Sequence, residues 1–129
     1  LLLVGACAEP QTGRVSDVGG GESFQSMIGD RVFFDVDSTQ LKTEWRRVLN
    51  RQAAWLKQYP HFSIVIEGHT DERGSHEYNL ALGARRAQTI ASYLAVQGVP
   101  ASRMKTISYG KQRPEVVGSD EGAWSRNRR

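Results

Sequence analysis

The sequence predicts an α/β domain, an α+β two-layer sandwich whose elements follow the order βαβαβ. Two helical patterns of apolar residues, one from about Lys42 to Gln58 and one ending near Leu94, alternate with three short runs typical of strands. The 129 residues are 39% hydrophobic, which is enough for one modest core. We therefore expect a single folded domain over residues 31–129, preceded by a tail.

The tail has the composition of a leader followed by a tether. Residues 1–6 are apolar and lack an initial Met, so they resemble the end of a signal peptide whose start is missing. Cys7, the only cysteine, follows small residues as in a bacterial lipobox, in which the Cys is lipidated. Residues 8–30 contain a proline, a run of three glycines and few large apolar side chains, which is typical of a flexible tether. The alternatives are a leftover thiol at Cys7 and an arm without a role.

The folded part begins with a strand and a helix. Val32-Phe33-Phe34 is typical of a strand, and the acidic, turn-prone stretch 35–38 ends it. The helix from about Lys42 to Gln58 ends at Tyr59-Pro60, because the residue before a proline disfavours helical backbone. Its apolar face contains Trp45, Val48, Leu49, Ala53 and Leu56.

A second strand and a second helix form the centre of the chain. The strand covers Phe62 to Glu67 and contains the β-branched run Ile64-Val65-Ile66, which Gly68 ends. After a charged loop over residues 69–77, Asn79 is a good N-cap and Gly98 a plausible C′ residue. The expected apolar stripe of this helix comprises Leu80, Ala84, Ala87, Ala91 and Leu94.

The last elements are less regular. Residues 99–103 are a connector, and Met104 to Tyr109 alternates enough for a strand. Ala123 to Arg129 has the pattern of a short helix or turn.

The charged loop follows the carboxyl end of a strand, where open α/β sheets commonly bind ligands. Asp71 lies in this loop, and Arg86 is expected to project towards it from the rim of the helix. One fixed anion and one fixed guanidinium can hold a zwitterion, since Arg binds carboxylates through two parallel hydrogen bonds. The alternative is that Asp71 and Arg86 pair with each other or with solvent.

Several motifs occur in a characteristic order: GHTDERG, YN, LGARRA, SYGKQRP and WSRNRR. From about Val32 to Arg129 the chain thereby resembles the OmpA-like peptidoglycan-binding domain family, which is non-catalytic and binds the diaminopimelate of uncrosslinked stem peptides. The resemblance implies that Asp71 holds the ammonium group and Arg86 the carboxylate of that residue. It also implies that Asn79 and Arg128 complete the pocket and that Asp35 lies beside it.

Within that family, the lipobox and the short tether make the chain resemble the lipid-anchored members. It implies an anchor in the outer membrane through lipid on Cys7, with the domain facing the periplasm, and Ala8 after the Cys favours this sorting. It further implies a role in the Tol-Pal system of cell-envelope integrity and cell division, with TolB as a partner. In the family an apolar strand follows the Asn127-Arg128-Arg129 segment, so we expect a final strand to be missing here.

Other classes of protein fit less well. A metal site at His69, Asp71 and His76 lacks the usual zinc spacings, and no cofactor is expected. An acid pair of Glu67 with Asp71 or Glu72 is the other catalytic option. A small metal-dependent or carboxylate-based cell-wall hydrolase is therefore the alternative function. The net charge of +3 comes from scattered basic residues, which does not indicate a nucleic-acid binder.

Overall fold

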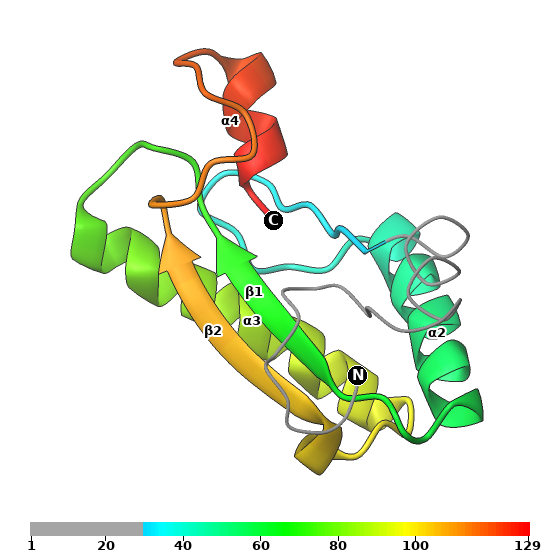
Figure 1. Cartoon of the computed structure of the whole chain (residues 1–129). Helices are drawn as coiled ribbons and strands as arrows, with labels where there is room; N and C mark the ends of the chain where they lie inside the picture. The colour runs from blue at the N-terminus through cyan, green and yellow to red at the C-terminus, as the bar shows by residue number, and fades with distance from the viewer. Residues whose placement is uncertain (1–29) are drawn as a thin grey trace.

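The computed structural model describes residues 30–129 (Figure 1). In chain order the elements are the helix α2 (Thr43–Gln58), the strand β1 (Ile64–His69), the helix α3 (His76–Val96), the 3-10 turn η2 (Ala101–Arg103), the strand β2 (Met104–Gly110) and the helix α4 (Glu121–Asn127). The leader, Cys7 and all but the last residue of the predicted tether lie outside the described residues.

The two strands form a parallel sheet, and α3 is the connection between them. Ile64 pairs with Met104, and the register continues to the pair of Gly68 and Ser108 before it shifts by one residue. Figure 1 shows α3 running along one face of both strands, with α2 beside it. The α/β character and the layering of helices on a sheet are thus confirmed.

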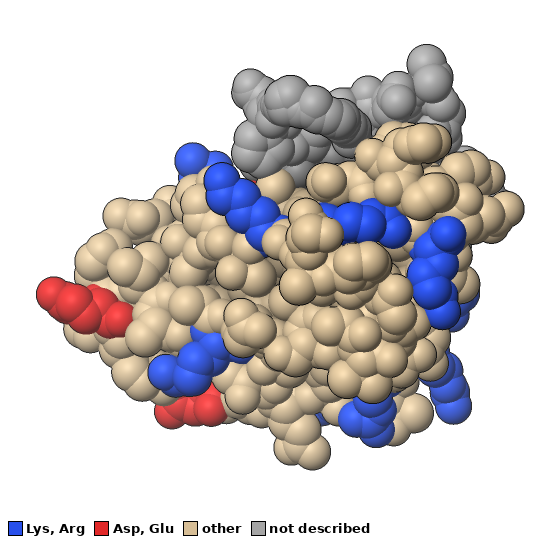
Figure 2. Space-filling view, turned by 90° about the horizontal axis from the view of Figure 1, so that it is seen from below, with Lys and Arg blue, Asp and Glu red and all other residues tan. Residues whose placement is uncertain are grey.

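The molecule has two distinct ends. The strands begin at one end, which also contains the end of α2 and the connection from α3 to β2; we call this end the base (residues 57–64 and 96–105). The strands finish at the loop end, which holds residues 70–75 and α4 (Figure 1). Figure 2 views the molecule from the base, where blue Lys and Arg side chains are spread over a mostly uncharged surface with little red.

The prediction of a strand at Val32-Phe33-Phe34 is wrong. Within residues 30–63 no strand forms, so the sheet of the described region has two strands instead of three. The backbone N–H of Phe34 donates to the carbonyl of Arg128 at 2.9 Å, which is a single contact rather than a ladder. A strand needs successive hydrogen bonds to a neighbour, and this segment has none in residues 30–129 beyond that one. A further strand after Arg129 stays a prediction.

The sequence predicted that Gly68 ends the strand, but β1 continues to His69. Its role is to let α3 cross the strand closely. A Cβ atom at Gly68 would lie 1.7 Å from the carbonyl oxygen of Gly83 in α3, and a Cβ at Gly83 would lie 2.3 Å from the Ser108 hydroxyl. The two glycines therefore fix the distance and the rotation of α3 over the sheet.

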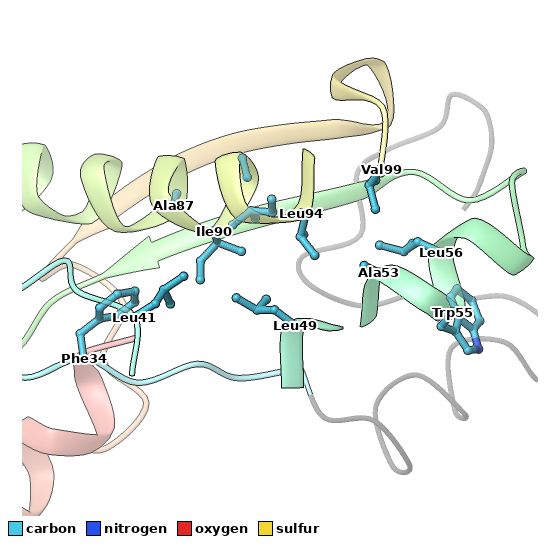
Figure 3. Close-up of a cluster of buried hydrophobic side chains, with 12 residues drawn as sticks. Phe34, Leu41, Leu49, Ala53, Trp55, Leu56, Ala87, Ile90, Leu94 and Val99 are labelled. Carbon is cyan, nitrogen blue, oxygen red and sulfur yellow. The ribbon is translucent and has the colours of Figure 1, made fainter. Parts of the chain in front are cut away.

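The core lies between α2, α3 and the sheet (Figure 3). Leu49, Ala53 and Leu56 are buried, as predicted for α2, whereas Trp45 and Val48 are half-buried. The buried cluster as a whole contains Phe34, Leu41, Leu49, Ala53, Trp55, Leu56, Ile66, Ala87, Ile90, Ala91, Leu94 and Val99. In residues 30–129 no helix is both long enough and apolar enough to cross a membrane.

The helix α3 differs from its prediction at its start. It begins at His76, and Ser75 is the N-cap, because its side chain accepts a hydrogen bond from the Tyr78 N–H at 3.1 Å. Asn79 is therefore a buried residue of the first turn rather than a cap. Gly98 has a φ of 106°, which confirms it as the C′ residue.

The apolar stripe of α3 is also rotated from the prediction. Ala87, Ala91 and Leu94 are buried as expected, but Leu80 and Ala84 are exposed. The buried face near the start of α3 instead contains Leu82, Gly83 and Arg86. The physical reason is the contact between Gly83 and Gly68, which turns this face of the helix towards β1.

The contact between the glycines can be tested by substitution. Gly68→Ala should lower the free energy of unfolding by about 3 kcal/mol or more, because the new methyl group overlaps a backbone carbonyl that cannot move freely. Gly122→Ala in α4 is the matched control, since its nearest neighbour would be 3.5 Å away. Urea denaturation of both variants measures the difference. Equal stabilities would show that α3 does not depend on this close approach.

Candidate functional site

A cavity of about 250 Å³ opens at the loop end of the molecule, beside the finish of β1 and the first turns of α3. This is the place where the sequence predicted a ligand site. The lining residues are Val36, Asp37, Thr70, Asp71, Arg73, Gly74, Tyr78, Asn79, Leu82 and Arg86. Three separate segments thus build the wall: residues 36–37, the loop 70–74 and α3.

Asp71 supplies the negative charge of the cavity. Its side chain is only 9% exposed, and both carboxylate oxygens accept hydrogen bonds from Arg73. The Nη2 atom of Arg73 is 2.8 Å from Oδ2. Burial alone would raise the pKa of the Asp71 carboxyl, but the hydrogen bonds and charges of Arg73, with help from Arg128, hold this pKa below its ordinary value. Asp71 is therefore ionised at neutral pH.

Arg86 supplies the positive charge, and it is 1% exposed rather than at a helix rim. Its guanidinium donates three hydrogen bonds of 3.0 Å to the carbonyl oxygens of Asp35, Ser38 and His69. Within the described residues no carboxylate forms an ion pair with it. Burial and the nearby charge of Arg128 lower the pKa of Arg86 to about 10, so the group is still protonated at neutral pH.

Asp71 and Arg86 therefore do not pair with each other, although both line the same cavity. Asp71 is ion-paired with Arg73 and, at 3.5 Å, with Arg128. Arg86 has five N–H groups, of which three are used by carbonyl oxygens. The structure thus places a carboxylate and a guanidinium that are not paired with each other on the wall of one cavity.

Asn79 and Arg128 support the site in different ways. Asn79 lines the cavity, and its amide Nδ2 donates to the carbonyls of Arg73 and Ser75 at 2.7 and 3.0 Å, which fixes the loop before α3. Arg128 is buried outside the lining residues. It contacts Asp71 and donates to Glu121 at 2.8 Å and to the Phe34 carbonyl at 2.9 Å. Arg128 is thus placed to position Asp71 rather than to face the cavity.

The side chain of Asp35 is not part of the cavity wall. It is 63% exposed and forms an ion pair of 3.0 Å with Lys42, while its carbonyl holds Arg86. Asp37 lines the cavity in its place, with its carboxylate accepting from the Tyr78 hydroxyl. Asp37 has a φ of 56°, a left-handed conformation that Asp tolerates better than most residues. The signal in the sequence was the turn-prone pair of acids, which did not indicate which acid turns inward.

Arg73 is the site residue that sequence reasoning missed. Its guanidinium lies 4.0 Å above the ring of Trp124, whose indole N–H donates to Glu72 at 2.9 Å. Arg73 therefore bridges the loop and α4 while it covers Asp71. The Asp-x-Arg spacing was the available signal, because a carboxylate readily accepts the N–H and side chain of the residue two positions later.

The catalytic alternatives are not assembled. Within residues 30–129 no three His, Cys, Asp or Glu side chains are placed to hold a metal ion. His69 is buried, stacks on Tyr109 and hydrogen-bonds Glu67 at 2.9 Å, whereas His76 is exposed. The hydrogen bond to His69, opposed by burial, lowers the pKa of Glu67. Neither Glu67 nor Glu72 lines the cavity with Asp71.

The influence of Arg73 on Asp71 gives a prediction about pH. Arg73→Ala should raise the pKa of Asp71, because the hydrogen bonds that favour its ionised form are lost. The ionised carboxylate stabilises the fold above its ordinary pKa of 3.8, and this stabilisation disappears as the pH falls through the lower pKa of the folded state. Raising the folded pKa makes that contribution smaller.

Titration of the Asp71 carboxyl carbon by NMR measures this effect directly. Arg126→Ala is the control, since Arg126 is exposed on α4. An unchanged Asp71 pKa in the Arg73 variant would mean that Arg73 does not hold the carboxylate in solution.

Comparison with known proteins identifies the family of the chain. The model of the OmpA family matches residues 33–128. A peptidoglycan-associated lipoprotein of Agrobacterium fabrum is 57% identical over 86% of the chain, and the chain spans 63% of that relative's length. A peptidoglycan-associated lipoprotein of Mesorhizobium japonicum is 46% identical over the whole chain and 83% of its own length.

Solved structures show the same fold. The peptidoglycan-associated lipoprotein of Burkholderia pseudomallei is 40% identical and superposes with a TM-score of 0.75, over 78% of this chain and 87% of that one. The C-terminal domain of Helicobacter pylori MotB is 20% identical with a TM-score of 0.68, over 76% and 77% of the two chains, and shows likeness of fold alone. The chain therefore belongs to the OmpA family, and within that family it groups with the peptidoglycan-associated lipoproteins.

Proposed function

We propose that this chain binds peptidoglycan non-covalently by holding the zwitterionic end of diaminopimelate in the stem peptides. The observation that carries the proposal is the placement of Asp71 and Arg86, opposite in charge and unpaired with each other, on the wall of one cavity. The free end of diaminopimelate carries an ammonium and a carboxylate on one carbon atom. The cavity thus offers one partner for each charge.

Asp71 is the partner of the ammonium group. Both of its oxygens are occupied by Arg73, so the ligand has to share or replace that contact. Arg73 is 40% exposed, and its guanidinium can move towards solvent without opening the core. Arg128 behind Asp71 and the Asn79 contacts with the loop keep the carboxylate in place during this exchange.

Arg86 is the partner of the carboxylate group. A buried cation without an acid partner is costly, and a ligand carboxylate offsets this cost when it accepts the remaining N–H groups. The three carbonyl contacts orient the guanidinium before the ligand arrives. Preorganisation of this kind lowers the entropy lost on binding.

The names of the relatives support a wider role. We infer that lipid on Cys7, which lies outside the described residues, anchors the chain in the outer membrane and that the domain ties this membrane to the wall. From the resemblance of its motifs to that family we further infer that the chain acts without catalysis in the Tol-Pal system of envelope integrity and cell division, with TolB as its partner. One stem peptide binds modestly, and many anchored copies facing one lattice add avidity.

Binding to purified sacculi tests the proposal. Asp71→Asn and Arg86→Lys should each weaken binding at least about thirtyfold, because one charge of the ligand loses its matched partner. Lys retains a positive charge but cannot make the two-pronged contact. Arg86→Ala is a poor choice, since the carbonyls of Asp35, Ser38 and His69 would lose their donor and the fold would weaken.

The control is Arg85→Ala, the exposed neighbour of Arg86 on α3, which should bind like the parent. The supernatant should contain no soluble muropeptides after incubation with the sacculi. Undiminished binding by both site variants would rule out the zwitterion site. Muropeptide release that depends on Asp71 would instead favour the hydrolase.

A further inference from the structure

The base carries basic residues that play no part in the cavity described above. Residues 57–64 and 96–105 contain the cations Lys57, Arg103 and Lys105 and no Asp or Glu. Of the cations at or near the base, Arg51, Lys57 and Lys105 are exposed, and none of the three forms an ion pair within the described residues. At the loop end, by contrast, Asp71 and Glu121 are ion-paired.

Contacts across the base join three elements of the fold. Lys57 lies against the turn after α3, since a Cβ atom at Gly98 would be 3.1 Å from its Cδ atom. Lys105 is the second residue of β2 and pairs with Val65 of β1. The guanidinium of Arg103 donates to the carbonyls of Leu56, Tyr59 and Phe62 at 2.7 to 2.8 Å. The end of α2, the turn η2 and the start of the sheet therefore form one fixed surface.

Two exposed apolar side chains also belong to the base. Val96, the last residue of α3, is 82% exposed, and Tyr59, which follows α2, is 43% exposed. Tyr59 is held by its ring contacts with Trp55 at 4.7 Å and Phe62 at 6.4 Å. Exposed aromatic and aliphatic residues on a surface that also carries Lys and Arg are typical of surfaces that rest on the headgroups of a bilayer.

We propose that the base and the adjoining part of α2 dock on an anionic phospholipid surface through Arg51, Lys57 and Lys105, with Tyr59 and Val96 entering the headgroup layer. Charge complementarity identifies the occupant as anionic, and the exposed Tyr59 and Val96 favour a lipid layer over a soluble acidic protein. The residues that line the cavity belong to the loop end, which lies opposite the base in Figure 1, so the cavity faces away from the membrane. The proposal uses the proposed function only in that a lipid anchor keeps the base near a membrane.

The expected contact is weak for a single domain and depends on salt. Each cation near an anionic bilayer strengthens binding by about fivefold, so three cations contribute about a hundredfold. The attraction is lost within a Debye length and falls as the ionic strength rises. A tethered domain experiences a high effective lipid concentration, which makes such a contact relevant.

Co-sedimentation with vesicles tests this surface, using the full 129-residue chain without lipid on Cys7. The chain should bind vesicles of phosphatidylglycerol and phosphatidylethanolamine, and bind vesicles of phosphatidylcholine much less. The combined variant Arg51→Gln, Lys57→Gln, Lys105→Gln should bind the anionic vesicles about a hundredfold less. All three side chains are exposed, so thermal unfolding should match the parent.

The control removes three exposed cations from outside the base: Arg85→Gln, Arg113→Gln, Arg126→Gln. Its net charge equals that of the first variant, so any difference between them reports the position of the charge. Equal vesicle binding by the two variants, or equal binding of the parent to both kinds of vesicle, would overturn the proposal. Sacculus binding is measured in parallel and should be unchanged in the base variant, which separates this surface from the cavity.

Discussion

The buried guanidinium of Arg86 is the interaction on which the loop end depends. Three carbonyl oxygens from two distant segments, residues 35–38 and the finish of β1, converge on this one side chain of α3. The segment before α2 forms no strand of its own in the described region, so these hydrogen bonds are a principal tie between it and the sheet. The same contacts that hold the fold also orient a positive charge into the cavity.

Burying a cation without an acid partner opposes folding, and the lowered pKa of Arg86 is a sign of that opposition. The arrangement is understandable if an anion occupies the site during function. Asp71 differs, because Arg73 and Arg128 satisfy it in the free protein. The two charges of the cavity therefore differ in the free protein: within the described residues Arg86 has no acid partner, whereas Asp71 is paired with two arginines. Proteins often depart at functional sites from the arrangement that would be most stable, and a buried cation without an acid partner is such a departure.

The sequence predicted the positions of the helices and strands along the chain better than it predicted which side of each helix is buried. The apolar periodicity located α2, both strands and most of α3, because these patterns depend on local spacing. The stripe of α3 was rotated because the contact of Gly68 with Gly83 is a tertiary contact between residues 15 positions apart. For the same reason Arg86 was expected at the rim, whereas the structure buries it beneath residues 35–38.

The charges and motifs of the sequence indicated Asp71, Arg86 and Asn79, and all three line one cavity. The contacts of Asp35 and Arg128 could not be predicted, because they depend on how distant segments fold together.

The proposed site holds both charges of one zwitterion. Calorimetric titration can compare a stem peptide that ends in diaminopimelate with the same peptide ending in lysine, which keeps the side-chain ammonium but lacks the carboxylate for Arg86. The lysine peptide should bind at least about thirtyfold more weakly, because Arg86 has no carboxylate to hold. Equal affinities for the two peptides would contradict it.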